Sequence, residues 1–299
     1  MEQSLHISNF PGLYREETSV REKYFLVEQV KTRCINFGWQ VEPHFHSYLY
    51  QIFFVKGGTA EIHLNAHKYK LEAPFLIYIP PNYIHGFSFS PNVDGDIISF
   101  SNYYTYSFFK EFPIIEKSIA FPILLSRECS KDKDAISIIE TLLELEAEFY
   151  EERDSFKDIY IHVKLASLLL SIASLKEKAN DFHLSKNSSE LDYFRQFLEM
   201  VKTQISPFQP IEFYAKKLGV SLSHLNRLCK TISNDTPLSI IQYEIISMAK
   251  ILLLNDKINV SDVAYSLGFN DPSYFIRLFK KKTGMTPKAY KFSSSKNSK

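Results

Sequence analysis

The stretch SLGFNDPSYFIRLFKKKTGMTPKAYK, residues 266–291, decides the fold of the C-terminal part of this chain. Gly268 suits the left-handed conformation that ends a helix. Asp271 is a good N-cap for the next helix, and Pro272 fits its first position. The apolar residues of that next helix recur at helical spacing and share one face: Phe275, Leu278 and Phe279. The stretch therefore predicts a helix, a tight turn and a second helix.

A second copy of this frame lies upstream, in IEFYAKKLGVSLSHLNRLCKTISNDTPLSII, residues 211–241. Each copy has an Ala followed three residues later by Leu-Gly, then an apolar residue and a polar cap. The corresponding residues are Ala215, Leu218, Gly219, Val220 and Ser221 in the first copy and Ala264, Leu267, Gly268, Phe269 and Asn270 in the second. Each copy ends in Thr-Pro, and in the first Ser221 or Ser223 is the expected cap. One such frame fits many helix pairs, but two copies indicate a repeated helix-turn-helix unit.

The charge of the chain is unevenly distributed. From Pro207 onward there are 14 Lys and Arg against 6 Asp and Glu, a net charge of +8, whereas the remainder has 21 against 28, a net charge of −7. A solvated surface with a basic tail would explain this as well as a nucleic-acid-binding end would. The repeat decides between the two, because the second helix of each copy turns polar and basic side chains outward.

These outward side chains suit base edges and phosphates in a major groove. The predicted DNA contacts are Ser221, Ser223, His224, Asn226, Arg227 and Lys230 in the first copy and Asn270, Ser273, Ile276, Arg277 and Lys280 in the second.

The region from about Asp192 to Lys291 resembles the AraC/XylS family of bacterial transcription regulators. The resemblance is carried by Gly268-Phe269, Tyr274-Phe275, Phe279-Lys280-Lys281, Gly284, Thr286-Pro287 and Tyr290. It implies a cytoplasmic regulator, an activator that works with RNA polymerase, in which a long helix joins two helix-turn-helix motifs that enter adjacent major grooves. The chain departs from the family at Ile245, where the linker helix usually carries an Arg.

Residues from about 20 to 125 predict short strands, because they are rich in aromatic and β-branched residues and are interrupted by Gly, Pro and Asn. Lys56-Gly57-Gly58-Thr59 predicts a hairpin turn. Many short strands with close turns indicate an antiparallel sandwich or barrel.

Residues 134–178 predict two amphipathic helices with a break near Glu152–Ser155. The apolar stripe of Ile139, Leu142, Leu145, Ile159 and Val163 exceeds what a small sheet needs, so we expect these helices to pair two chains in a homodimer. A stripe that only caps the barrel is the alternative. The polar stretch HLSKNSSE, residues 183–190, is the expected linker, which divides the chain into residues 1–185 and 186–299.

Two histidine motifs stand out in the N-terminal part. His44 and His46 share one face of a strand, because alternate residues of a strand point the same way, and His85 follows in PPNYIHGF. The spacing resembles the cupin signature, with Gln51 in place of the usual Glu. Three His can hold a divalent metal, but we expect no metal and no cofactor here, since regulators with this domain often keep the histidines as scaffold. The predicted effector-binding residues are His44, His46, Tyr48, Gln51, Tyr78 and His85.

The expected architecture is α+β: an N-terminal cupin-like β-barrel with dimerisation helices, followed by an all-α domain of two helix-turn-helix motifs joined by a long helix. The expected function is sequence-specific binding of promoter DNA under the control of a small-molecule effector. An aromatic carboxylate is the candidate effector, because within the family the chain looks most like regulators of aromatic-acid catabolism. The alternative is a metal-dependent cupin enzyme, a dioxygenase or isomerase, fused to a DNA-binding domain.

Overall fold

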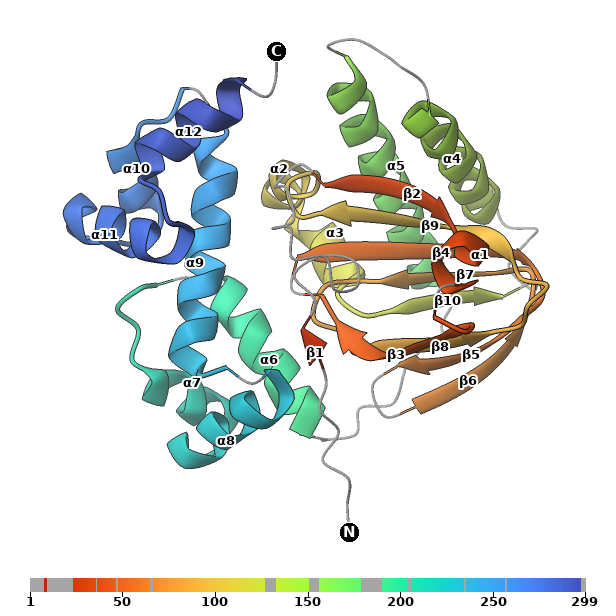
Figure 1. The fold of residues 1–299 in the computed structure, drawn as a ribbon, viewed down its shortest axis with the longest axis horizontal. Helices are drawn as coiled ribbons and strands as arrows, with labels where there is room; N and C mark the ends of the chain where they lie inside the picture. Colours follow the sequence, from red (N-terminus) through yellow and green to blue (C-terminus); the bar gives the residue numbers. More distant parts are fainter. Residues whose placement is uncertain are drawn as a thin grey trace. The chain divides into compact units, whose positions relative to one another are not determined.

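The computed structural model describes residues 8–9, 24–35, 37–46, 48–64, 67–126, 133–150, 156–178, 190–203, 206–233, 235–255 and 257–296. The chain forms two compact units, Ile7–Lys186 and Asn187–Lys299, each with its own core (Figure 1). The predicted linker and the predicted boundary at 185/186 fall almost entirely outside the described residues.

The first unit is built on two five-stranded sheets. The first sheet has the order β1 (Ser8–Asn9), β3 (Gln40–Phe45), β8 (His85–Phe89), β5 (Thr59–Leu64) and β6 (His67–Glu72). The second has the order β10 (Ile123–Ser126), β7 (Phe75–Ile79), β4 (Leu49–Gly57), β9 (Asp94–Ser101) and β2 (Phe25–Gln29). All strand pairs are antiparallel except β1 with β3. The predicted antiparallel β architecture is confirmed.

Side chains that alternate along the strands build two separate cores. Between the two sheets lie Phe53 and Ile77 of the second sheet and Ile62 and Phe87 of the first. Tyr50, Ile52, Tyr78, Ile98 and Phe100 belong instead to a core shared with helices, on the other face of the second sheet. This division follows from the period of two along a strand, and it decides which residues line the space between the sheets.

The turn at Gly58 joins strands of different sheets. Gly58 has φ of 89°, and a Cβ added there would lie 2.8 Å from Ser90 Oγ and from Val93 Cα. The predicted hairpin is therefore wrong, since β4 pairs with β7 and β9 whereas β5 pairs with β6 and β8. Gly at this position permits both the left-handed backbone and the close approach that the crossing requires.

In the described part of the first unit the helices are α1 (Val30–Ile35), α2 (Tyr106–Glu111), α3 (Pro113–Ser118), α4 (Lys133–Tyr150) and α5 (Lys157–Lys178). The last two confirm the predicted helix pair, and they lie over the second sheet (Figure 1). The break between them, residues 151–155, lies outside the described residues.

Helix α5 is apolar on two faces. One face buries Ile161, Leu165, Leu168, Leu169 and Ile172 in the core shared with the second sheet. The other leaves Ile159, Val163 and Leu170 exposed, and with Phe156 directly before the helix these side chains are between 53% and 68% exposed. The predicted dimer stripe is thus divided: its α4 members Leu142 and Leu145 are buried within the unit, whereas its α5 members face outward. Residues 157–176 are long and apolar enough to span a membrane by length and composition alone, but here one face of the helix packs within a β domain.

The second unit is all-helical, as predicted. Its helices are α6 (Glu190–Thr203), α7 (Ile211–Leu218), α8 (Leu222–Ser233), α9 (Pro237–Leu253), α10 (Val260–Ser266), α11 (Pro272–Thr283) and α12 (Pro287–Lys296). Helices α7 and α8 form the first helix-turn-helix motif, α10 and α11 form the second, and α9 joins them (Figure 1).

The turns of both motifs have the predicted chemistry. Gly219 and Gly268 have φ of 69° and 83°, the left-handed region that favours glycine. Ser221 Oγ accepts a hydrogen bond from the backbone N–H of His224, and Asp271 caps α11 by accepting from the backbone N–H of Ser273. Phe269 is buried in the second turn. These local contacts set the angle between the two helices of each motif.

Candidate functional site

The outward faces of α8 and α11 form a repeated polar surface. Ser223, Asn226, Arg227 and Lys230 are exposed on α8, and Ser273, Ile276, Arg277 and Lys280 take the same positions on α11 with Ile276 half-buried. Both sets have the spacing i, i+3, i+4 and i+7, which places the four side chains of each helix on one face. The opposite faces bury Leu225, Leu228 and Cys229 on α8 and Phe275, Leu278 and Phe279 on α11. Each helix therefore presents four side chains outward from a rigid core.

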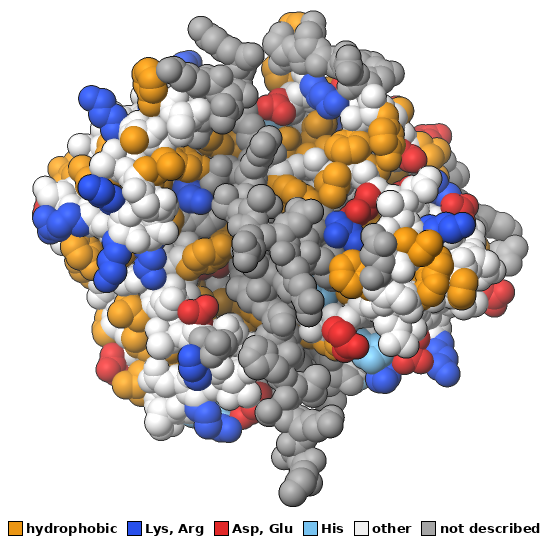
Figure 2. Space-filling model, viewed as in Figure 1, with side chains coloured by type: hydrophobic (Ala, Val, Ile, Leu, Met, Phe, Trp, Pro, Cys, Tyr) orange, Lys and Arg blue, Asp and Glu red, His pale blue; other side chains and the backbone are white. Residues whose placement is uncertain are grey.

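The remaining predicted DNA contacts flank these faces. Ser221 and Asn270 are exposed in the turns before α8 and α11, and His224 is half-buried in the first turn of α8. Figure 2 shows Lys and Arg side chains gathered over α10 and α11. The last turn of α11 adds Lys281 and Lys282, both exposed. Lys281 and Lys282 were not among the predicted DNA contacts, although the basic run that contains them was a signal for such contacts.

An acidic residue outside the motifs reaches the first recognition face. Arg227 donates to Glu190 Oε1 at 2.9 Å, and both side chains are about half exposed or more. Glu190 is the first residue of α6 and lies 37 residues earlier in the chain. The α11 counterpart, Arg277, forms no ion pair within 4 Å with any residue that the structure describes. Sequence reasoning missed Glu190, because nothing in the local pattern connects it with α8.

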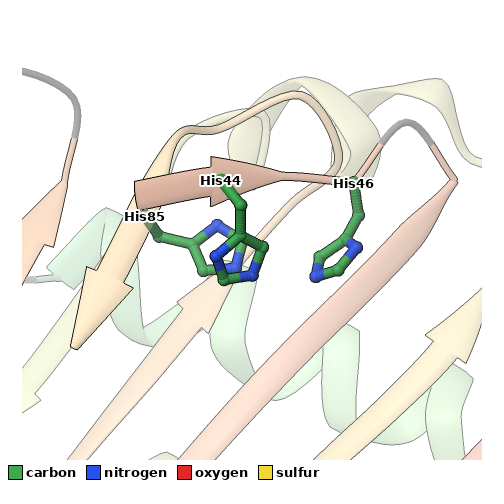
Figure 3. A group of neighbouring side chains, drawn as sticks. All are labelled: His44, His46 and His85. Atoms are coloured by element: carbon green, nitrogen blue, oxygen red, sulfur yellow. The ribbon is translucent and has the colours of Figure 1, made fainter. Parts of the chain in front are cut away.

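The histidine group lies in the first unit, at the end of β3. His44 on β3, His46 directly after it and His85 on β8 are at most 2% exposed. His44 and His85 are register partners, and their ring centroids lie 4.4 Å apart. The His46 ring lies 4.9 Å from that of His44 and 5.4 Å from that of His85. Figure 3 shows the three rings converging on the same side of β3. The structure thus brings together the three predicted histidines.

The protonation state of two of these rings follows from their surroundings. Burial, and secondarily the neighbouring His85 and His46, hold the pKa of His44 well below its usual range, and burial lowers the pKa of His85 to about 3. Both rings are therefore neutral near pH 7. His44 Nδ1 lies 2.8 Å from the carbonyl oxygen of Glu42, and His85 Nδ1 lies 2.7 Å from that of Tyr83. A carbonyl oxygen only accepts, so Nδ1 carries the proton in each ring and Nε2 presents a lone pair.

The other predicted effector residues are divided by the sheet. Gln51 faces the space between the sheets, because its neighbours Tyr50 and Ile52 face the helices, and its amide nitrogen donates to Ser99 Oγ at 3.3 Å. Tyr78 lies on the helix side with Tyr50 and Ile52, so it does not join the histidines. Tyr48 is buried directly before β4.

Asn82 is a neighbour of the histidines that sequence reasoning missed. Its backbone N–H donates to the carbonyl oxygen of His46 at 2.8 Å. Its φ of 68° lies in the left-handed region, which Asn tolerates. The sequence signal for this turn was an Asn directly after two prolines.

The three imidazoles fit a metal ion of the kind that cupin domains hold. Their ligand nitrogens all lie within 4.8 Å of one another. Nitrogens that bind one zinc ion at about 2.1 Å lie at most about 4.2 Å apart, so side-chain movements of less than roughly 1 Å would suffice. The hydrogen bonds from Nδ1 to backbone carbonyls are the outer contacts that orient metal-binding histidines.

The described cysteines do not supply a nucleophile. Cys34 and Cys229 are buried, and burial raises the pKa of each thiol to about 12. A thiol with such a pKa is unreactive near neutral pH. Cys129 lies outside the described residues.

Comparison with known proteins agrees with the two predicted domain types. Residues 214–292 match the helix-turn-helix domain family, and residues 33–96 match the cupin domain family. The chain is 29% identical over 161 residues to the uncharacterized HTH-type transcriptional regulator YdeC of Bacillus subtilis, which covers 53% of this chain and 51% of YdeC. It is 28% identical over 141 residues to the virulence regulon transcriptional activator VirF of Yersinia enterocolitica. This match covers 46% of this chain and 50% of VirF. The matched region thus spans about half the length of each relative.

Among solved structures, ToxT from Vibrio cholerae O395 aligns with 90% of this chain and 97% of its own, at 15% identity and a TM-score of 0.34. The second unit thus contains a helix-turn-helix domain and the first a cupin domain, the combination that the resemblance to the AraC/XylS regulators implies.

Proposed function

We propose that this protein is a sequence-specific transcription regulator that inserts α8 and α11 into neighbouring segments of the DNA major groove. The observation that carries the proposal is the pair of matched outward faces, each with an Arg and a Lys at i+4 and i+7 from a Ser. An α-helix fits the major groove, where Arg reads guanine and Ser or Asn reads other edges. Lys281 and Lys282 add charge for the phosphates.

The test uses the full chain and the DNA upstream of its own gene. Fluorescence anisotropy should show tighter binding to that DNA than to a random duplex of equal length. Raising the salt from 50 to 200 mM should weaken binding by on the order of 10³-fold if six phosphates are contacted. Equal affinity for both duplexes would contradict the proposal.

We further infer that the regulator is a cytoplasmic activator that contacts RNA polymerase, as its resemblance implies, and that its first unit binds a small effector. The support for the effector site is a group of buried polar side chains, the histidines with Gln51, beside the apolar core between the two sheets. An aromatic carboxylate is the candidate effector that the resemblance suggests. An effector controls the protein only if it binds the DNA-competent and the inactive states with different affinities.

A homodimer is part of the same proposal. Ile159, Val163 and Leu170 are exposed on α5, as are Phe156 directly before this helix and Leu143 and Tyr150 on α4. Apolar side chains gathered on one face mark interaction surfaces, and a two-fold pair is the commonest closed assembly. Light scattering should give a dimer for the natural chain and a monomer for Ile159→Asp with Val163→Asp. Thr59→Asp, at an exposed position of β5, is the control and should remain dimeric. A natural chain that is monomeric at micromolar concentration would show that the exposed side chains of α5 do not form a homodimer interface.

A metal-dependent enzyme remains the second candidate, and only the histidine group favours it. The regulators that the chain resembles give no support for catalysis. Turnover of an added substrate that disappears with His44→Ala would favour the enzyme, whereas DNA binding by the same protein favours the regulator.

A further inference from the structure

The turn between α6 and α7 carries an exposed aromatic side chain. Phe208 is 52% exposed and lies in the turn 206–209, in which the backbone N–H of Gln209 donates to the carbonyl oxygen of Ser206 at 3.4 Å. A proline stands directly before Phe208, and Pro210 is the N-cap of α7. Because proline restricts φ, the turn is stiff and holds Phe208 in a fixed place directly before the first helix-turn-helix motif.

The Phe208 ring contacts the second motif. Its centroid lies 6.1 Å from that of Phe269, in the turn between α10 and α11, and 6.1 Å from that of Tyr274, in the first turn of α11. The Phe208 and Tyr274 rings are stacked, Phe269 meets Phe208 edge-on, and Phe269 and Tyr274 are 5.8 Å apart. These are favourable geometries for aromatic pairs. Phe208, Phe269 and Tyr274, here called the aromatic clasp, therefore join the two motifs.

The aromatic clasp lies beside the recognition face of α11. Tyr274 directly follows Ser273 of that face and lies roughly 100° further around the helix, on the flank between the recognition face and the buried face. Phe269 is buried and its ring centroid lies 5.3 Å from that of Phe275 in the core of the second motif. A displacement of Phe208 would therefore act on α11 itself.

Helix α9 is the other link between the two motifs. Helices α6 and α8 pack against it, and so do α10, α11 and α12. A single helix of 17 residues can bend and twist. The segment 206–210 extends toward α11 and supplies a second point of attachment (Figure 1). Two bodies that are joined at two separate points keep one relative orientation better than two bodies on one helix.

We propose that Phe208 is a positioning residue for DNA recognition: the aromatic clasp holds α8 and α11 at one separation and one relative angle, and so sets the spacing of the two DNA segments that the protein selects. Successive major-groove segments on one face of DNA lie about 34–36 Å apart, and each base pair adds a rotation of roughly 35°. A rigid pair of helices therefore fits one spacing. The effect on DNA rests on the proposed function, whereas the restraint between the motifs does not.

The first measurement needs no DNA. Spin labels are attached to Lys216→Cys on α7 and Lys288→Cys on α12, two exposed positions outside the recognition faces, in the full chain with Cys129→Ser. Labelled chains are diluted with unlabelled chains so that only distances within one chain are recorded. Double electron–electron resonance should give a narrow distance distribution with Phe208 and a broader one with Phe208→Ala. Distributions of equal width would overturn the proposal.

The second measurement uses the DNA upstream of the gene for this protein. Footprinting locates the two contacted segments, and one base pair is inserted between them. The insertion should weaken binding of the natural chain at least about tenfold and that of Phe208→Ala by only about threefold. On the unaltered DNA, Phe208→Ala should bind about two- to tenfold more weakly, the range for one aromatic pair. An equal penalty for the insertion in both proteins would overturn the proposal.

The control variants separate the aromatic clasp from general loss of stability. Phe208→Tyr keeps the ring and should retain the natural spacing preference. Tyr274→Ala should relax the preference as Phe208→Ala does, and the double variant should add little, because both changes remove the same contact. Phe292→Ala, which removes an exposed aromatic residue of α12 outside the aromatic clasp, is the matched control. Thermal unfolding checks that each variant is folded, and an equally relaxed preference in Phe292→Ala would overturn the proposal.

The two measurements distinguish this proposal from the proposed function. A clasp-dependent distance distribution in a chain that binds upstream and random DNA equally would keep the restraint between the motifs and remove the proposed function. Selective binding of upstream DNA, with the same penalty for the insertion in the natural chain and in Phe208→Ala, would keep the regulator and remove the positioning role of Phe208.

Discussion

The two helix-turn-helix motifs share a design but differ in what surrounds their recognition helices. Around α11 the core is aromatic, with Phe269, Phe275 and Phe279 in ring contact. On α8 itself the buried residues are smaller, Leu225, Leu228 and Cys229, and the neighbouring aromatic pair is Phe197 on α6 and Tyr214 on α7. The recognition face of α11 is followed by Lys281 and Lys282, whereas Arg227 on α8 is engaged by Glu190. We therefore expect the second motif to act as the firm anchor on DNA and the first as the adjustable reader, because Arg227 must leave Glu190 before it can contact DNA.

Helix α9 carries a further difference between the two sides. Glu244 is 5% exposed, and burial raises the pKa of its carboxyl from 4.5 to about 7 against a smaller opposing effect of Lys202 on α6. The buried carboxyl therefore belongs to the side of the unit formed with α6. The same helix reaches α10, α11 and α12 at its other end.

The largest expected effect is the pH dependence of the first motif. The folded state holds the Glu244 proton more tightly than the unfolded chain, so the free energy of unfolding should fall as pH rises from about 4.5 to 7. The loss should be on the order of 3 kcal/mol for the helix-turn-helix unit. Glu244→Gln should remove this slope and raise the Tm at pH 8, as measured by thermal unfolding between pH 5 and 8.

The exposed Glu212→Gln on α7 is the matched control and should keep the slope. Hydrogen exchange at pH 8 should show faster opening of α8 than of α11 in the natural chain. Equal protection of both helices would remove the distinction between a firm and an adjustable motif.

An intermediate effect is expected from removing the two arginines in turn. Arg277→Ala should weaken binding to the upstream DNA by about 1–3 kcal/mol, the range for a side chain that reads a guanine. Arg227→Ala should cost less, because the natural guanidinium must first leave Glu190. Anisotropy titrations at one salt concentration measure both, and a larger loss for Arg227→Ala would reverse the assignment of anchor and reader.

The smallest expected effect concerns the acidic partner itself. Glu190→Gln should strengthen DNA binding by less than about 1 kcal/mol, because exposed ion pairs contribute little. The gain should vanish in the Arg227→Ala background and persist in the Arg277→Ala background. Glu199→Gln, on the same helix but paired with Arg195, is the control. A gain that survives Arg227→Ala would mean that Glu190 acts through general repulsion of DNA.

Much of the second unit could be predicted from the sequence because its signals are local. Gly219, Gly268, Ser221 and Asp271 act on backbone within a few residues of themselves, and the spacing of i, i+3 and i+4 assigns each side chain to a face of its helix. Both recognition faces therefore appear in the structure as predicted. Their contact with DNA remains a prediction.

In the first unit, local sequence patterns do not predict which face of a strand or helix packs against which neighbour. The alternation of β7 alone does not say which face meets the helices, so Tyr78 was expected beside the histidines and lies on the opposite side of the sheet. Helix α5 is apolar on two sides, and periodicity cannot choose which side covers the sheet. Gly58 signals a turn, but only the pairing of distant strands shows that the chain changes sheets there.

The sequence by itself determined the double helix-turn-helix, the β architecture of the first unit and the three histidines, since helix caps, glycine turns and residue spacing act over a few positions. Only the tertiary structure decided that His44 meets His85, 41 positions later, in neutral and fixed tautomers, and that Glu190 reaches Arg227. Those contacts depend on strand register and helix packing, which are set by the whole core. The residues next to them in the sequence therefore carry no pattern that predicts them.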